Sequence, residues 1–413
     1  MKTERMYLKD KYLSNLQTKI SELKADPSFP DDLVVCLEKT IFFPGGGGQS
    51  CDIGTINGQP LVKVSEKDGE IFHQIQGGKA LMDDGSLSVG AEVNLELDWD
   101  RRFDNMQRHC GEHILSGVFY DLYGGVNRGF HMGDDYMTID ISLEDNPEYT
   151  TLTHEMAMEA ELGANKIIWK DLPVTAHHFD TKSDASHIAL RKELTVEEDI
   201  TIVTIGDVTH PADSVACCGT HPSTSGQVGL LKIYKVEPNK GMFRVFFDAG
   251  ARALDGYRRR FEILSSIEKD LSAGVPDILD KYQASKDRAR DIRDRLFRLT
   301  KEVQERELLE IKRYMDENSS ESPLFEYENL AVDDIIEIGR NLEGSIPNIL
   351  FLIHKPSLTV LLFSDSQDCG KLVKDNVSVF SGKGGGNRTF ARAIFTSEDN
   401  ALMFIDAIRK LTR

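Results

Sequence analysis

Two pairs of side chains in this chain have the types and the spacing of metal ligands. His109 and His113 stand four residues apart, and Cys217 and His221 repeat that separation far downstream. Residues four apart on a helix project from successive turns toward one side. Imidazole nitrogens and a thiolate are the usual donors of tetrahedral zinc sites. The four residues together therefore predict a Zn²⁺ site.

Each part of this pattern also has another interpretation. A free cysteine is commonly a small buried apolar residue. Cys217 lies in a segment rich in Gly, Ser and Thr, however, which favours a ligand role, and its neighbour Cys218 could take its place. The run from His109 to His113 also fits the H-x-x-E-H pattern, in which Glu112 would be the general base of a zinc peptidase.

Two glycine-rich stretches offer bare backbone that another chain can approach closely. Gly45 to Gly48 precede Gln49, and Gly384 to Gly386 lie between Lys383 and Arg388. The first stretch lacks the spacing and the Lys-Ser/Thr ending of a P-loop, and a flexible turn is its simplest explanation. The second could be a strand-to-helix turn or, with its flanking cations, a site for phosphate or an RNA edge.

The elements around these residues follow strand and helix patterns in turn. Short apolar runs up to residue 97, separated by turn signals such as Asn57-Gly58, predict a small antiparallel barrel or sandwich. Over 100–123 the apolar residues recur with a helical period, so His109 and His113 lie on one side of a helix. The pattern further predicts a helix over 185–194 and a loop over 209–226 that carries Cys217 and His221.

The C-terminal part begins with a region that is nearly free of proline. Residues 251–315 predict two helices interrupted at Gly274-Val275-Pro276, suited to a spacer or a dimer contact. Residues 321–413 predict a small α/β domain with a closing helix over 397–411. The chain is therefore predicted as an α+β multi-domain protein with a β-barrel at 1–97, a zinc-binding α+β domain at 98–250, a helical hairpin at 251–320 and an α/β domain at 321–413.

The composition is that of a soluble globular protein, with 40% hydrophobic and 28% charged residues. No apolar run is long enough to cross a bilayer, and six cysteines in 413 residues do not form a secreted disulfide framework, so a cytoplasmic protein is expected. The net charge of −19 argues against loose binding to nucleic acid. Residues 251–316 and 371–413 carry more cations than anions, which makes the C-terminal end the natural phosphate-facing surface.

In their order along the chain, these motifs resemble the editing and C-terminal parts of alanyl-tRNA synthetase. They are more closely similar to the long form of the freestanding alanyl-tRNA editing proteins called AlaX. The resemblance covers nearly the whole chain. It rests on the glycine loop Pro44 to Gln49 followed by Asp52 and Gly54, on His109 and His113, on Cys217-Cys218-Gly219-Thr220-His221, and on Gly382-Lys383-Gly384-Gly385-Gly386.

This resemblance implies a trans-editing hydrolase that cleaves serine, and in some cases glycine, from mischarged tRNA(Ala). It implies zinc ligation by His109, His113, Cys217 and His221, with the metal positioning the tRNA 3′ end and a water molecule. Residues 98–250 would be the editing domain. Residues 321–413 would be a tRNA-binding domain of the DHHA1 type, and the helical segment would contribute to a homodimer.

The predicted site has further members. Glu112 and His131 are the polar groups expected near the ester, although Glu112 stands where the synthetase pattern has a small polar residue. Four protein ligands would fill a tetrahedral zinc shell, so some vacancy is expected if the metal acts on water. A non-catalytic, zinc-containing tRNA-binding protein is the main alternative. The RNA-contacting residues are predicted to be Gly46, Gly47, Gly48, Gln49, Lys383, Gly384, Gly385, Gly386 and Arg388.

Overall fold

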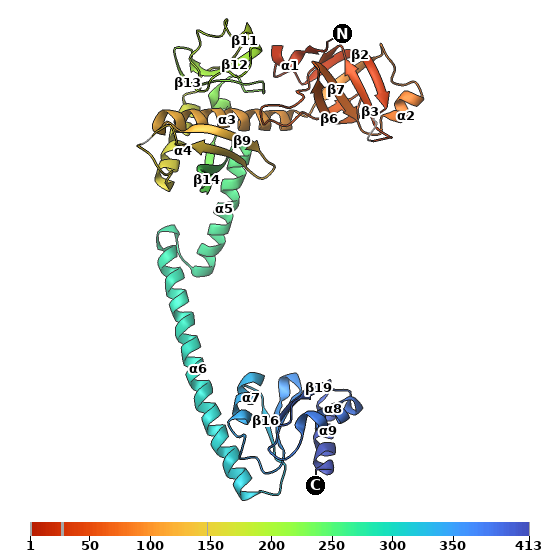
Figure 1. Cartoon of the computed structure of the whole chain (residues 1–413), viewed down its shortest axis with the longest axis vertical. Coiled ribbons are helices and arrows are strands. Elements are labelled where there is room, and N and C mark those ends of the chain that lie inside the picture. Colours follow the sequence, from red (N-terminus) through yellow and green to blue (C-terminus); the bar gives the residue numbers. More distant parts are fainter. Residues whose placement is uncertain (1, 26–28, 147, 413) are drawn as a thin grey trace. The chain divides into compact units, whose positions relative to one another are not determined.

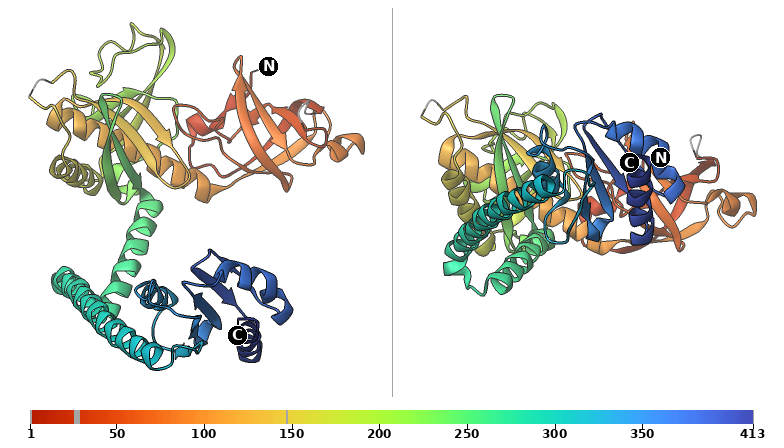
Figure 2. Two further views of the ribbon diagram at one scale, coloured as in Figure 1. Left: turned by 60° about the horizontal axis from the view of Figure 1, so that its bottom comes forward. Right: turned by 90° about the horizontal axis from the view of Figure 1, so that it is seen from below.

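The computed structural model describes residues 2–25, 29–146 and 148–412. The chain divides into two compact units, Met1–Ser265 and Ser266–Arg413 (Figures 1 and 2). Both units combine helices with sheets, which confirms the predicted α+β multi-domain class. Within the described residues, no helix combines the length and the apolar character that a membrane span requires.

The N-terminal strands of the first unit close into a six-stranded barrel. Alternate residues of its strands point inward, as with Val93, Leu95 and Leu97, because strand side chains alternate between the two faces. The turn Asn57-Gly58 has positive φ at both residues and joins two strands as a tight hairpin, as predicted. In barrel order the strands are β2 (Asn15–Ala25), β3 (Leu33–Leu37), β7 (Glu70–Ile75), β6 (Gln59–Lys67), β5 (Gly54–Ile56) and β8 (Glu92–Leu97).

Three short elements accompany the barrel. Strand β1 (Glu4–Arg5) pairs in parallel with β4 (Lys39–Thr40), and helix α1 (Met6–Lys9) follows directly after β1. Helix α2 (Lys79–Asp83) stands between β7 and β8. Tyr7 of α1 is buried and packs edge-on against Phe43, so α1 is fixed to the segment that leads into the glycine loop.

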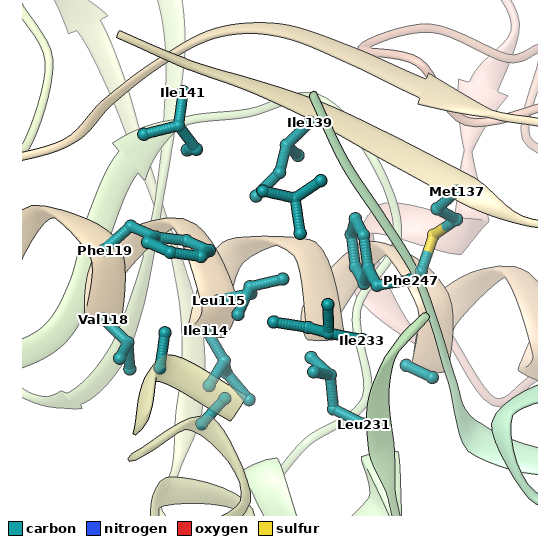
Figure 3. Close-up of a cluster of buried hydrophobic side chains, with 14 of the residues drawn as sticks. Ile114, Leu115, Val118, Phe119, Met137, Ile139, Ile141, Leu231, Ile233 and Phe247 are labelled. Atoms are coloured by element: carbon teal, nitrogen blue, oxygen red, sulfur yellow. The ribbon is translucent and has the colours of Figure 1, made fainter. Parts of the chain in front are cut away.

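Helix α3 (Trp99–Tyr123) is the central element of the first unit. It begins at Asp98, whose side chain accepts a hydrogen bond from Arg101 N, and it ends at Gly124 with φ 64°. A four-stranded sheet and helix α4 (His154–Trp169) pack against it, and a three-stranded sheet lies on another side (Figures 1 and 3). The sheets are β14 (Leu231–Asn239), β15 (Met242–Ala249), β10 (Met137–Ser142) and β9 (Val126–Met132), then β11 (Val174–Thr181), β12 (Glu198–Asp207) and β13 (His210–Ala216).

Two local predictions for this unit are wrong. Residues 185–194 form turns instead of a helix, because Ala185 and Ile188 fold back onto Ile200 and Ile202 of β12 in a small separate core. The predicted loop over 209–226 begins with β13, which pairs with β12 and buries Asp213 and Ser214. Cys217 therefore follows a strand end, which fixes its backbone more firmly than a loop would.

The second unit is built on a five-stranded sheet in the order β16 (Leu324–Tyr327), β17 (Leu350–His354), β18 (Thr359–Phe363), β20 (Phe390–Ile394) and β19 (Lys383–Gly386). Both faces are covered, because successive residues of β17 enter two different cores. Helices α6 (Ile278–Glu317) and α7 (Val332–Arg340) contribute to one core, and α8 (Cys369–Asn376) and α9 (Glu398–Leu411) to the other. Helix α5 (Gly250–Leu271) precedes α6, so the two helices predicted around Gly274 are confirmed.

Candidate metal centre

The four predicted metal ligands lie together in the structure. His109, His113, Cys217 and His221 each offer a donor atom, and these atoms all lie within 4.8 Å of one another. Cys217 Sγ is 3.4 Å from His109 Nε2 and 3.4 Å from His221 Nε2. Helix α3 supplies the two histidines from successive turns, and the segment after β13 supplies the other pair. The three imidazoles are buried, with exposed fractions of 2–4%.

Two of the imidazoles are oriented by polar partners on the side away from the cluster. His109 Nδ1 is 2.9 Å from Gln49 Oε1, and His113 Nδ1 lies 3.2 Å from Asp213 Oδ2. Gln49 is itself fixed, because Thr220 N donates to its Oε1 and its Nε2 donates to Thr220 Oγ1. Such partners set the ring orientation and leave the Nε2 atoms free to bind a metal.

The glycine loop of the barrel packs directly against this cluster. A Cβ atom at Gly48 would lie 2.5 Å from the Phe130 ring, and Phe130 stacks on His109 with ring centroids 5.6 Å apart. The loop is anchored by Asp52, which accepts hydrogen bonds from Phe43 N and from the buried Arg102 of α3. The barrel therefore contributes one wall of the candidate site.

The electrostatics suit a metal-binding thiolate. Although burial opposes ionisation, the nearby imidazoles of His109, His113 and His221 hold the pKa of the Cys217 thiol well below its ordinary value. The pKa of Asp213 is also lowered despite its burial, by His113 and by Arg191, whose Nε donates to Asp213 Oδ1 at 2.6 Å. In contrast, partial desolvation of the thiol and the Cys217 charge raise the pKa of Cys218, although part of this residue is exposed to solvent.

The two predicted catalytic residues have different surroundings. Glu112 is buried, with Oε2 3.9 Å from His113 Nε2, and its Oε1 accepts hydrogen bonds from Ser116 Oγ at 2.6 Å and Asn127 Nδ2 at 2.8 Å. His131 is exposed on β9, where the adjacent Phe130 faces the cluster. Because successive strand residues point to opposite faces, the structure does not bring His131 to the cluster. Its role stays a prediction.

The predicted RNA-contacting residues fall into two groups. Gly46, Gly47 and Gly48 are exposed beside the cluster, whereas Gln49 is buried and bonded to His109 and Thr220. In the second unit the residues from Lys383 to Arg388 are exposed. The strand-to-helix turn that was one interpretation of Gly384 to Gly386 is wrong. Lys383–Gly386 is the edge strand β19, which pairs on one side with β20.

The donor set fits zinc. Zn–N bonds of about 2.0 Å and Zn–S bonds of about 2.3 Å in a tetrahedron place ligand atoms about 3.5 Å apart. The two 3.4 Å distances from Cys217 Sγ agree with that value. The peptidase alternative gives Cys217 and His221 no part, yet both lie in the cluster, and the cluster contains no carboxylate.

Sequence reasoning missed the residues that orient the ligands. The position of Gln49 directly after four glycines marked it as a functional residue, but the sequence predicted contact with RNA and not with a histidine. Asp213 lies in the segment taken for a loop, and Phe130, which stacks on His109, and Asn127, which bonds to Glu112, lie on β9 without any spacing that links them to α3. Their roles depend on contacts between distant segments, which no local pattern in the sequence displays.

Comparison with known proteins places this geometry in a class. Residues 200–246 match the family described as the threonyl and alanyl tRNA synthetase second additional domain, and this range includes Cys217 and His221. Over 405 residues the chain is 30% identical to the alanyl-tRNA editing protein AlaX-L of Pyrococcus horikoshii, covering 94% of each chain. The chain belongs to the family of alanyl-tRNA editing proteins of the AlaX type, which confirms the resemblance stated from the motifs.

Two further relatives match over parts of their length. The chain is 32% identical over 248 residues to the alanyl-tRNA editing protein Aarsd1 of Bos taurus, covering 59% of this chain and 51% of the relative. It is 26% identical over 423 residues to the alanine–tRNA ligase of Pyrococcus abyssi, covering 99% of this chain and 44% of the ligase. The match to the ligase therefore extends across both units of this chain.

Proposed function

We propose that this protein is a trans-editing hydrolase that deacylates tRNA(Ala) mischarged with serine or glycine. The observation that carries the proposal is the buried cluster of His109, His113, Cys217 and His221, in a chain of the AlaX family. These four residues would hold Zn²⁺, which when bound supplies a fixed positive charge that orients the ester end of the tRNA. A tRNA substrate places the protein in the cytoplasm.

The residues around the cluster have proposed roles that follow from their contacts. Gln49 and Asp213 hold the rings of His109 and His113 in the ligating orientation. Glu112 is the proposed acceptor for the proton of the attacking water, because its Oε2 lies beside the cluster while Ser116 and Asn127 fix its Oε1. Ester hydrolysis by water requires no protein nucleophile.

The proposed RNA contacts use exposed backbone. Gly46, Gly47 and Gly48 form a surface lip beside the cluster, without side chains that would hinder a nucleotide. In the second unit, β19 offers the free side of an edge strand, with Lys383 and Arg388 exposed at either end. We assign both segments to tRNA binding.

A homodimer is the proposed assembly, and α6 supports it with an exposed apolar stripe. The positions follow a heptad spacing, in alternating steps of four and three residues, which is the pattern of a two-helix seam. A seam left uncovered would expose an unusually large apolar surface for a soluble chain. The exposed apolar residues of the stripe are Tyr282, Ile292, Leu296 and Leu299, and the heptad positions between Tyr282 and Ile292 are Ser285 and Ala289.

The test of the function is a deacylation assay on Ser-tRNA(Ala) and Gly-tRNA(Ala) with the zinc-loaded protein. Glu112→Gln keeps the size of the side chain and should slow hydrolysis by about 10²- to 10⁴-fold while the zinc content stays unchanged. Glu144→Gln, at an exposed position, is the matched control and should retain full activity. The editing proposal fails if wild type deacylates neither substrate faster than buffer.

The same assay tests the alternative function. Four protein ligands complete a tetrahedral shell, and that observation favours a structural zinc in a non-catalytic tRNA-binding protein. Tight binding of tRNA(Ala) without deacylation at any zinc loading would support this alternative. Deacylation by wild type that falls in His113→Ala would exclude it.

A further inference from the structure

A buried ion pair lies behind one of the candidate metal ligands. His113 Nδ1 lies 3.2 Å from Asp213 Oδ2, and Arg191 Nε donates to Asp213 Oδ1 at 2.6 Å. Arg191 Nη2 donates to Oδ2 at 3.4 Å, so the guanidinium holds both oxygens of the carboxylate. The side chains of Arg191 and Asp213 are 8% and 0% exposed. Three buried polar groups therefore connect the metal cluster to the segment 185–194.

The backbone brings Asp213 close to helix α3. A Cβ atom at Gly117, one turn after His113, would collide with the carbonyl oxygen of Ala212 and lie 3.2 Å from Asp213 Cβ. Glycine leaves the room that this close approach of β13 needs. The backbone fixes only the position of the Asp213 Cβ, however, and the direction of the carboxylate depends on what holds its oxygens.

Arg191 is the group that holds this carboxylate. Within the described residues, the hydrogen bonds to the side-chain oxygens of Asp213 come from Arg191, and those of the guanidinium go to Asp213. Although burial opposes it, three nearby carboxylates raise the pKa of Arg191, so its guanidinium keeps its charge. They are the carboxylates of Asp213, Glu112 and Asp121.

A purely structural role for the pair has less support. The backbone of Arg191 is already joined to β13, because its N–H donates to the carbonyl of Ser214 at 2.9 Å. Ala185 and Ile188 of the same segment pack on β12 in a small apolar core. A buried ion pair is also weak evidence of stability, since the desolvation of two charges can exceed their attraction. A gain in stability therefore does not account for a buried Arg191 at this place.

We propose that Arg191 is a positioning residue of the metal centre, which acts through Asp213 on His113. Its guanidinium holds the carboxylate so that Oδ2 faces His113 Nδ1, and this keeps Nε2 of the imidazole directed at the other ligands. Outer partners of this kind orient metal-binding histidines. A lysine ammonium is a point charge and lacks the planar fork that fits two carboxylate oxygens, so the orientation requires arginine. The inference rests on the zinc ligation of the proposed function, but not on its reaction.

Zinc affinity, measured by competition with a chromogenic chelator, tests this inference. Arg191→Lys keeps the charge but loses the fork, and it should weaken zinc binding by about threefold to tenfold, somewhat less than the loss of a direct orienting partner. Arg244→Lys is the matched control and should leave the affinity unchanged. Arg244 holds both oxygens of Asp140 with Nε and Nη2 at 2.8 Å each, in a pair that includes no residue of the cluster.

The visible spectrum of the protein loaded with Co²⁺ separates orientation from stability. The d–d bands of Co²⁺ report the geometry of its ligands, so Arg191→Lys should change these bands and Arg244→Lys should not. Denaturant unfolding of the metal-free proteins measures stability independently. An Arg191→Lys protein with the zinc affinity and the Co²⁺ spectrum of wild type would overturn the inference, whatever its stability, and leave the ion pair a structural one.

A double-mutant cycle shows whether Arg191 acts through Asp213. Asp213→Asn removes the direct partner of His113 and should weaken zinc binding by about 10- to 100-fold. Adding Arg191→Lys to Asp213→Asn should change the zinc affinity little further, because the carboxylate that Arg191 positions is then absent. Losses of affinity that multiply in full would overturn the action through Asp213.

These measurements do not depend on ester hydrolysis. Equal zinc affinities and spectra in wild type and Arg191→Lys would overturn this inference even where wild type deacylates mischarged tRNA(Ala). If the variants behave as expected but wild type deacylates neither Ser-tRNA(Ala) nor Gly-tRNA(Ala), the proposed function fails and the role of Arg191 stands.

Discussion

Replacing Gly219 by alanine should disrupt the metal centre through a single methyl group. A Cβ at this position would lie 2.3 Å from His109 Cε1, 2.4 Å from its Nδ1 and 2.8 Å from Gln49 Oε1. Gly219 does not have a positive φ, so alanine introduces no backbone strain and the effect is one of space alone. The methyl group is aimed at the contact by which Gln49 orients His109.

The expected size of the effect follows from these distances. Ordinary contacts of a Cβ begin at 3.4 Å, so the ring of His109 or the segment after β13 must move by about 1 Å. Such overpacking costs roughly 1–3 kcal/mol of stability. Loss of an orienting partner typically weakens metal binding by about 10- to 100-fold, and we expect the zinc affinity of Gly219→Ala to fall in that range.

Zinc affinity is measured by competition with a chromogenic chelator, and stability by denaturant unfolding of the metal-free protein. Gly274→Ala is the control, because its added methyl meets only Pro276 at 3.7 Å, an ordinary contact. A zinc affinity in Gly219→Ala equal to that of wild type would refute the reasoning, since the ring would then have found room without leaving its ligating position.

Three further changes have expected outcomes. In the metal-free protein the lowered pKa of Cys217 should allow iodoacetamide to alkylate it below pH 7, whereas Cys218, with a raised pKa, should react only at higher pH. Mass spectrometry of the labelled peptides measures both reactions. Bound zinc should protect Cys217 from alkylation. Burial lowers the pKa of His73 to about 4, below its unfolded value of about 6.5, so the unfolded state binds the proton first and stability is lost as pH falls through this interval. Between pH 7 and pH 4 the free energy of unfolding should fall by up to about 3 kcal/mol more in wild type than in His73→Gln, as denaturant unfolding at the two pH values measures. Equal falls in the two proteins would contradict a lowered pKa for His73. Leu296→Glu should convert a dimer to monomers in sedimentation experiments, whereas Arg293→Glu, outside the heptad stripe, should not.

The sequence predicted the parts of the site that depend on local spacing. The four-residue separation of His109 and His113 acts through helix geometry, and the helical period over 100–123 located that helix as α3. The hairpin at Asn57-Gly58 was likewise predictable, because positive φ at both turn positions favours these residue types. In each case the physical cause lies within a few neighbouring residues.

The failures concern segments whose conformation is set by distant partners. Residues 185–194 have a helical composition, yet Ala185 and Ile188 gain more by packing on β12 than a single short helix would gain alone. Strand β13 begins with His210-Pro211 in a polar stretch, and its pairing with β12 overrides this weak local signal. Its register places Asp213 next to His113, a contact that depends on the fold of the whole unit.

Gln49 shows how the fold changes the meaning of a motif. Taken with its glycines, the sequence indicated an RNA contact for the whole loop, but the buried pair of Asp52 and Arg102 docks the loop on α3 and places Gln49 against His109. The glycines let the loop approach this closely, since a side chain at Gly48 would collide with Phe130. A barrel that supplies the orienting partner of a candidate zinc ligand belongs to the candidate metal centre itself, so the residues proposed to bind metal and the loop proposed to meet RNA would act as one unit.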